Sequence, residues 1–261
     1  MTDFEQRGFA TPWNVPSREG CWFYHTMDIP GEEPVIGTWD MRGKAHQYFG
    51  NVDLVGKSVL DVGTASGFLS FEAEKLGASK VVGIDAWKGS IREMVPIRDY
   101  RENREKYRKM LDDSMIQMKK GYWYAHSRLG SKVQAYYGDI YDIPDEVGDF
   151  DVAIIGQILV HLKHPLSCIE QVAARVKPGG HLVITEGTYD SREPVAKFLW
   201  TPSNRVQTFS WWHLSQAFFE RFLTLLDFEL VSQSEDTYGL ADPSGKWGTY
   251  NLPTFVFRRL R

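Results

Sequence analysis

Five apolar runs of strand length follow one another along the middle of the chain, and each ends at or just before a glycine or a polar residue. They occupy residues 58–62, 80–85, 133–138, 150–156 and 181–185. The run at 150–156 is apolar and rich in β-branched residues, which is typical of a strand buried on both faces of a sheet. A helix is expected from Phe68, between the first two runs. The alternation of strands and helices predicts an α/β fold with a mostly parallel sheet.

The segment from Ser58 to Asp85 reads as one nucleotide-binding unit. A first strand ends in a turn with Gly63 and Gly67, a helix follows, and a second strand ends in Asp85. Glycine tolerates positive φ and lets the backbone approach a ligand, while the helix start presents unpaired N–H groups. A carboxylate at the end of the second strand can accept both hydroxyls of a ribose. The segment therefore predicts an adenosine-containing cofactor.

The residues around the turn distinguish between cofactors. Dinucleotide enzymes usually carry three glycines, as G-x-G-x-x-G, whereas here Ala65 lies between the two glycines. Asp61, two positions before Gly63, would repel a pyrophosphate but could hold a cationic ligand, directly or through water. S-adenosylmethionine has an ammonium and a sulfonium and no phosphate. On this segment alone, a glycine turn in an ordinary α/β domain is the alternative.

The turn resembles motif I of the class I S-adenosylmethionine-dependent methyltransferases, D/E-x-G-x-G-x-G, with Ala65 in place of the middle glycine. Asp139 after the third run, Gly156 after the fourth and the K-P-G-G sequence at 177–180 also match that family in order. The resemblance implies a Rossmann-like fold: a seven-stranded, mostly parallel sheet with helices on both faces and an antiparallel seventh strand. Strands six and seven fall at 228–232 and 254–258. The implied cofactor-binding residues are Trp39, Lys44, Asp61, Gly63, Thr64, Gly67, Asp85, Ala86, Trp87, Asp139, Ile140, Gly156 and Gln157.

Two further segments are similar to the bacterial tRNA wobble-uridine carboxymethyltransferases and their smaller relatives. They are residues 37–44, with Trp39 and Lys44, and residues 159–165 after the fourth strand. In that family Trp39 and Lys44 match positions that line the cofactor. The tyrosine that helps to hold a carboxylated cofactor is replaced by Val160, and the long N-terminal domain for tRNA is absent. Ordinary S-adenosylmethionine and a smaller acceptor are therefore expected.

The remaining segments predict a domain plan. Residues 1–50 are aromatic-rich and form an ordered arm, which serves as a lid or covers a sheet edge. Residues 51–261 form the methyltransferase domain, with a helical insertion at about 88–131, whose charges are read as a solvated face, and a cap segment at about 188–215 that leads into a helix at 213–226. Aromatic and polar side chains of these segments are candidates for substrate binding, with core packing as the alternative. They are Tyr24, Tyr122, Trp123, His126, Asn204 and Trp211.

Composition limits the function classes. The chain has 261 residues, 43% hydrophobic content and a net charge of −4 without a contiguous basic block. No electrostatic footprint for nucleic acid is seen, which disfavours RNA binding but leaves it open. Cys21 and Cys168 form neither a disulfide framework nor a metal motif, and no apolar stretch reaches membrane-spanning length. These features predict a cytoplasmic enzyme; they do not predict its oligomeric state.

Methyl transfer is an in-line displacement in which the protein mainly aligns donor and acceptor. A hydroxyl acceptor also benefits from a general base, and the candidates are His161 beyond the fourth strand and His25 in the arm. Asp139, Asp142, Glu186 and Asp190 could meet near the strand ends, but their spacing is not diagnostic, so no metal is predicted. The sequence thus predicts a methyltransferase acting on a hydroxyl or amine of a small molecule. The alternatives are a tRNA-modifying enzyme and a cofactor-binding protein without turnover.

Overall fold

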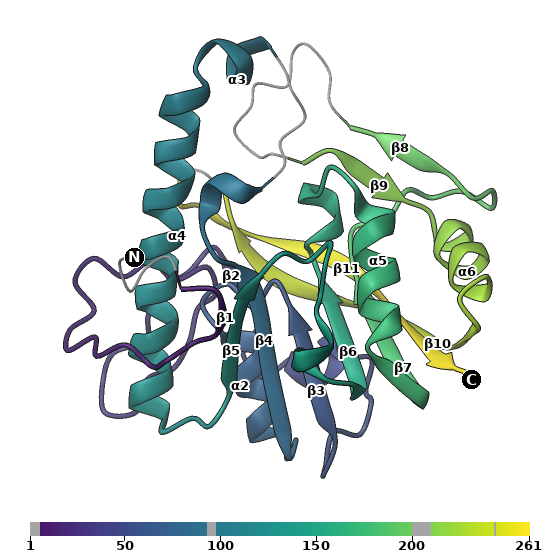
Figure 1. Ribbon diagram of the computed structural model, residues 1–261, viewed down its shortest axis with the longest axis horizontal. Coiled ribbons are helices and arrows are strands. Elements are labelled where there is room, and N and C mark those ends of the chain that lie inside the picture. Colours follow the sequence, from purple (N-terminus) through teal and green to yellow (C-terminus); the bar gives the residue numbers. More distant parts are fainter. Residues whose placement is uncertain (1–5, 93–97, 200–209, 243) are drawn as a thin grey trace.

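The centre of the molecule is a nine-stranded, mostly parallel sheet (Figure 1). The computed structural model describes residues 6–92, 98–199, 210–242 and 244–261. Five parallel strands form the middle of the sheet. In spatial order they are β5 (Gln134–Gly138), β4 (Lys80–Ala86), β3 (Ser58–Val62), β6 (Phe150–Gly156) and β7 (Val176–Thr185). The order changes direction beside β3, which brings the carboxyl ends of β3, β4 and β6 together where ligands of such sheets bind.

Two long antiparallel strands extend the sheet beyond β7. β11 (Trp247–Arg259) pairs antiparallel with β7, and β10 (Phe228–Ala241) pairs antiparallel with β11. The expected seventh strand, antiparallel to its neighbours, is therefore confirmed. The strands expected at 228–232 and 254–258 are only the sheet-core ends of this hairpin.

The prediction of seven strands was too small by two short edge strands. β1 (Gly8–Phe9) pairs with β5, and β2 (Trp39–Asp40) pairs with β10. Both belong to the N-terminal arm, whose backbone runs along the two edges of the sheet. A two-residue pairing has no periodicity of its own, so sequence could not reveal it.

Alternate residues of the strands enter two hydrophobic cores, one on each face. Val59 and Val81 belong to one core, while their neighbours Leu60 and Val82 belong to the other. Helices α2 (Phe68–Lys75) and α4 (Arg104–Leu129) cover the first face, and α5 (Pro165–Ala174) and α6 (Gln216–Thr224) cover the second (Figure 1). Helices on both faces are thus confirmed.

The insertion after β4 consists of a 3-10 helix and two α-helices, η2 (Gly89–Ile91), α3 (Arg98–Glu102) and α4. The charged first half of α4 is largely exposed, with Lys109 paired to Asp113 at 2.9 Å. Its second half packs against α2 and the sheet. The chain also has three short helical elements: α1 (Ala45–Tyr48), η3 (Asp145–Val147) and η4 (Leu159–His161).

The cap segment differs from expectation at its helix. β8 (Ala196–Phe198) and β9 (Trp212–Leu214) form a two-stranded sheet, so the helix expected from 213 begins only at Gln216. Ser215 explains the start, because its Oγ accepts a hydrogen bond from Phe218 N at 3.2 Å and caps the helix. Across the described ranges, no helix is both long and apolar enough to span a membrane.

Candidate active site

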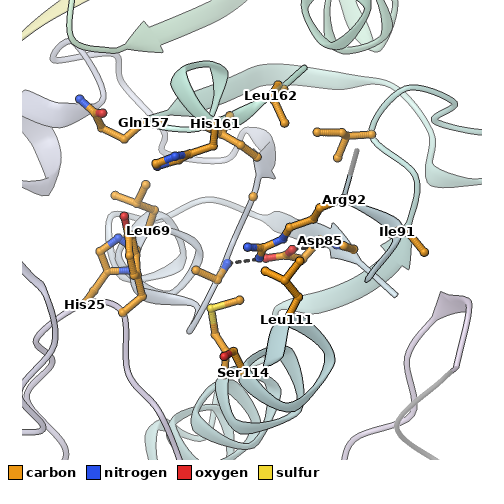
Figure 2. A pocket seen from close by; sticks show the side chains of 18 of the residues that line it. His25, Leu69, Asp85, Ile91, Arg92, Leu111, Ser114, Gln157, His161 and Leu162 are labelled. Atoms are coloured by element: carbon orange, nitrogen blue, oxygen red, sulfur yellow. Dashed lines mark hydrogen bonds between the residues drawn. The ribbon is translucent and has the colours of Figure 1, made fainter. Parts of the chain in front are cut away.

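A cavity of about 420 Å³ opens at the carboxyl ends of β3, β4, β5 and β6. The strand ends contribute Gly63, Asp85, Gly138 and Gly156 to its wall. The opposite wall comes from the N-terminal arm and from α4 (Figure 2). The predicted site residues that line the cavity are Tyr24, His25, Trp39, Gly63, Asp85, Ala86, Asp139, Ile140, Gly156, Gln157 and His161.

The glycine turn has the backbone geometry that its sequence predicts. Gly63 has φ 81° and Gly67 has φ 91°, and Gly67 caps the start of α2. The positive φ favours glycine at this position, and a Cβ on Gly63 would lie 2.5 Å from Ile158 Cδ1, so the end of that side chain would have to move. Ala65 also has a positive φ, 51°, and lines the cavity. The turn thus exposes backbone where a ligand can approach closely.

Asp85 is oriented by two backbone amides. Its Oδ2 accepts from Ala65 N at 2.8 Å and its Oδ1 from Ala86 N at 2.7 Å. The side chain is 8% exposed and faces the cavity, as Figure 2 shows. Because a carboxylate oxygen has two lone pairs, each oxygen can still accept one ligand hydroxyl. This is the geometry needed to hold a ribose diol, so the residues present fit an adenosine cofactor.

Asp61 lies behind the turn rather than in the cavity wall. It is 1% exposed, and its Oδ2 accepts from Ser70 Oγ at 2.7 Å, while Oδ1 has no hydrogen-bond partner. Burial raises its pKa to about 6, against the lowering effect of the hydrogen bonds from Ser70 and Thr64. Asp61 does not line the cavity and so makes no direct contact with a ligand there. Its Oδ1, which has no protein partner, is the atom that a bridging water would contact.

The loop after β6 carries Gln157 and His161 to the cavity (Figure 2). Gln157 has φ 50°, and its Nε2 is buried without a hydrogen-bond partner. Glu186, at the end of β7, holds this loop from below, because its Oε1 accepts from Leu159 N at 2.6 Å. Burial raises the pKa of Glu186 to about 8, although hydrogen bonds from the backbone of residues 158–160 oppose the shift. A buried side-chain amide without a hydrogen-bond partner is uncommon and calls for an explanation, such as a ligand or water.

His25 belongs to the arm and is fixed onto the glycine turn. Ser66 Oγ accepts from the backbone N–H groups of Tyr24 and His25, at 3.1 and 3.4 Å. The His25 ring packs 5.7 Å from Phe68, and its Nδ1 is buried without a partner. Burial lowers the pKa of His25 to about 3, so its ring is neutral at physiological pH. The arm is thus held on the cavity wall by hydrogen bonds to Ser66, a residue of the glycine turn.

Besides Asp61, three predicted cofactor residues have side chains that do not line the cavity. Lys44 pairs with Asp236 at 2.8 Å and donates to Thr237 O, which ties it to β10. Trp87 accepts from Lys119 Nζ through its carbonyl, at 2.7 Å, and does not line the cavity. Thr64 is buried at 2.8 Å from Ser70 Oγ and supports the turn from behind. A match to a family motif gives the position of a residue along the chain, but it does not determine the direction of its side chain.

The structure places four of the predicted substrate residues in packing contacts. Tyr122, Trp123 and His126 lie on the half of α4 that faces α2 and the sheet, with the Tyr122 ring 5.2 Å from Phe71. Trp211 is 1% exposed, and its backbone N donates to Val160 O. None of the four is among the residues lining the described cavity. Asn204 lies outside the described residues.

The structure also adds lining residues that the sequence did not single out as site residues. They come from the arm, the insertion and the strand ends: Trp22, Met41, Tyr48, Ala65, Leu69, Ile91, Arg92, Met110, Leu111, Ser114, Met118, Gly138, Tyr141, Ile158 and Leu162. Most are apolar, so periodicity alone reads them as core. Among these lining residues Arg92 alone is charged, and nothing in its sequence neighbourhood signals a ligand.

The comparisons with known proteins agree with this geometry. The methyltransferase-domain family matches residues 40–233, which is most of the chain. The chain belongs to this family, that of the class I S-adenosylmethionine-dependent methyltransferases. The fold and the cofactor predicted from motif I are therefore confirmed. The narrower resemblance to relatives of the tRNA wobble-uridine enzymes stays a prediction.

Individual relatives are distant. The ribosomal protein L11 methyltransferase of Deinococcus radiodurans is 29% identical over 154 residues, which cover 59% of this chain and 46% of the relative. The mitochondrial ubiquinone biosynthesis O-methyltransferase of Dictyostelium discoideum is 27% identical over 52% of this chain and 36% of its own length. The chain thus spans less than half of the length of these curated relatives.

A solved structure shows the same fold. The magnesium protoporphyrin IX methyltransferase of Synechocystis, with bound S-adenosylhomocysteine, superposes with a TM-score of 0.51 at 15% identity over 82% of this chain and 80% of its own. In the part of the chain that the structure describes, no group of three or more His, Cys, Asp or Glu residues has metal-binding geometry.

Proposed function

We propose that the protein transfers the methyl group of S-adenosylmethionine to a hydroxyl or amine of a small molecule. The observation that carries this proposal is the cavity, whose strand-end wall fits the cofactor and whose other wall is mainly apolar. Its volume of about 420 Å³ lies in the range of small-molecule sites, about 300 to 1,000 Å³. Since the arm and α4 both cover it, a compact acceptor fits better than a folded RNA.

Two regions of the wall would hold the cofactor. Asp85 would accept the ribose hydroxyls, and Asp139 with Ile140 at the end of β5 would face the adenine. The backbone at Gly63 and Ala65 would lie against the rest of the molecule. S-adenosylmethionine, when bound, supplies a methyl carbon already activated by the sulfonium. The task left to the chain is alignment of the acceptor with that carbon.

Two histidines at the cavity support an oxygen acceptor, because a hydroxyl must lose its proton during transfer. A general base works best when its pKa lies near the working pH. His25, with its pKa lowered to about 3, is a poor base and suits hydrogen bonding to the acceptor. His161 on η4 is therefore our candidate for the base, and Gln157 for a second hydrogen-bond donor.

A macromolecular acceptor is the second candidate. It is supported by the names of relatives that methylate ribosomal protein L11. The net charge of −4 argues against an extended contact with RNA. A cofactor-binding protein without turnover is the third reading, and the same experiment separates all three.

Calorimetry with S-adenosylhomocysteine tests the cofactor site. Asp85→Ala removes two hydrogen bonds to a carboxylate, and we expect binding about 100-fold weaker or worse. Asp113→Ala, an exposed residue of α4, is the matched control and should bind normally. Unchanged binding in Asp85→Ala would remove the assignment of Asp85.

Transfer of label identifies the acceptor class. The purified protein is incubated with tritium-labelled S-adenosylmethionine and with separate small-molecule, RNA and protein fractions of a cell extract. We expect label in the small-molecule fraction. Label in RNA or protein would favour the second candidate, and tight S-adenosylhomocysteine binding with no label in any fraction would favour a protein without turnover.

A further inference from the structure

Arg92 is the one Lys or Arg side chain among the described residues that line the cavity. It follows η2 directly, and Figure 2 shows its side chain extending into the cavity on the same side as Asp85. An arginine is charged at every physiological pH. The cavity therefore contains one permanent positive charge on an otherwise mainly apolar wall.

No described residue forms a hydrogen bond or an ion pair with the Arg92 guanidinium. The nearby carboxylate of Asp85 is engaged instead by Ala65 N and Ala86 N, at 2.8 and 2.7 Å. Asp139, the other acidic lining residue, accepts from Tyr141 N at 2.9 Å. Arginine presents five donors in a fork that matches carboxylate and phosphate, and among the described residues that fork has no acceptor.

Arg92 is solvent-exposed, and the cavity wall near it includes apolar side chains. Ile91 precedes it, and the face of α4 that lines the cavity carries Met110, Leu111 and Met118. Methionine side chains adapt to flat or irregular apolar ligands. A ligand that covers these residues would also remove water from around the guanidinium, which strengthens any charge-assisted hydrogen bond made there.

We propose that Arg92 binds an anionic group of the methyl acceptor, and that the acceptor is an apolar small molecule carrying one carboxylate, phosphate or sulfate. This inference rests on the proposed function, because it requires an acceptor bound beside the cofactor in the same cavity. Arg92 is then a specificity-determining residue: it selects a charged acceptor over a neutral one of the same shape.

The carboxylate of the cofactor itself is the other anion that could reach this site. Arg92 lies on the wall of Asp85, where the ribose is expected, whereas the carboxylate belongs to the opposite end of the methionine chain. The geometry therefore favours the acceptor as the source of the anion. Comparing S-adenosylhomocysteine with adenosine distinguishes the two sources, since adenosine has no carboxylate.

The test uses the full chain saturated with S-adenosylhomocysteine and two probes of equal shape, naphthalene-2-carboxylate and naphthalene-2-carboxamide. Calorimetry should show the carboxylate binding at least about fivefold more tightly, a preference that falls with added salt. Arg92→Gln should abolish the preference. Arg101→Gln removes an equal charge from the exposed helix α3 and should preserve it.

Several results would overturn the inference. They are equal affinity of both probes, binding of neither, or a preference retained in Arg92→Gln. A loss of S-adenosylhomocysteine affinity in Arg92→Gln with unchanged adenosine affinity would also do so, because it assigns Arg92 to the cofactor. Failure of the unmodified protein to bind S-adenosylhomocysteine is a separate outcome, which removes the proposed function itself.

Discussion

Glu186 offers a direct test of how burial controls the loop that carries Gln157 and His161. Its carboxyl is 2% exposed and accepts from Leu159 N at 2.6 Å. Two effects on its pKa oppose each other, since burial favours the neutral acid and the backbone hydrogen bonds favour the carboxylate. The structure indicates that burial dominates, with a pKa of about 8 against the usual 4.5.

This pKa difference makes stability depend on pH. A raised folded-state pKa contributes stability that is fully present below pH 4.5 and is lost as pH rises through 8. The whole shift corresponds to about 5 kcal/mol at 1.36 kcal/mol for each pKa unit. Between pH 5 and pH 9 we therefore expect the unmodified protein to lose about 4 kcal/mol through this single group.

Glu186→Gln removes the titration and keeps the shape. Urea unfolding of both proteins, followed by tryptophan fluorescence, gives the difference in free energy of unfolding at pH 5, 7 and 9. Other titrating groups, Asp61 and His25 among them, are present in both proteins and cancel in this difference. We expect the difference to shift by about 4 kcal/mol in favour of the variant as pH rises.

A control and a refutation follow from the same measurement. Glu229 is exposed and paired with Arg258 on the outer hairpin, so Glu229→Gln should show a difference that hardly changes with pH. If the difference for Glu186→Gln is also independent of pH, the backbone hydrogen bonds dominate and Glu186 is a carboxylate at pH 7. The argument that burial controls this site would then be refuted.

Three further predictions concern the site and its support. His25→Gln should be more resistant to acid, because the lowered pKa of about 3 costs the unmodified protein about 2 kcal/mol between pH 6.5 and 5; equal acid unfolding midpoints would contradict this. Gly63→Ala should lose S-adenosylhomocysteine affinity in calorimetry, since its Cβ would meet Ile158 at 2.5 Å, whereas Gly43→Ala, with φ 72° and open space, should bind normally. Trp123→Ala should lower the free energy of unfolding by about 3 to 5 kcal/mol as a core truncation; a variant of normal stability that no longer binds naphthalene-2-carboxylate would restore its predicted substrate role.

The residues that we assign to the cofactor could be brought to one cavity from the sequence alone because they lie within short sequence intervals. Gly63 follows β3 directly, Asp85 is the second-last residue of β4 and Gly156 is the last residue of β6, and parallel strands bring their carboxyl ends to one edge. The positions of these residues can therefore be predicted from the strand pattern alone, without information on contacts between distant parts of the chain. The same logic failed for Lys44, whose partner Asp236 is 192 residues away.

The acceptor half could not be predicted because helix orientation is a tertiary property. The aromatic cluster on α4 and the methionines before it both suit a ligand, but only one of these faces can turn toward the cavity. In the structure Trp123 packs into the sheet core while Met110 and Met118 line the cavity. The large aromatic side chains serve better as core, because they bury the most apolar area.

Ser66 explains why the arm belongs to the site rather than to the sheet edge alone. It lies inside the glycine turn, and its hydroxyl accepts the backbone N–H groups of Tyr24 and His25. The arm does pair with both edges of the sheet, through β1 and β2, so the edge-covering role is also present. Because the cofactor turn and the arm are joined at one residue, a ligand that orders the turn should also order the wall that faces the acceptor. On the proposed function, we therefore expect the arm, and not only the strand ends, to take part in determining which acceptor is methylated.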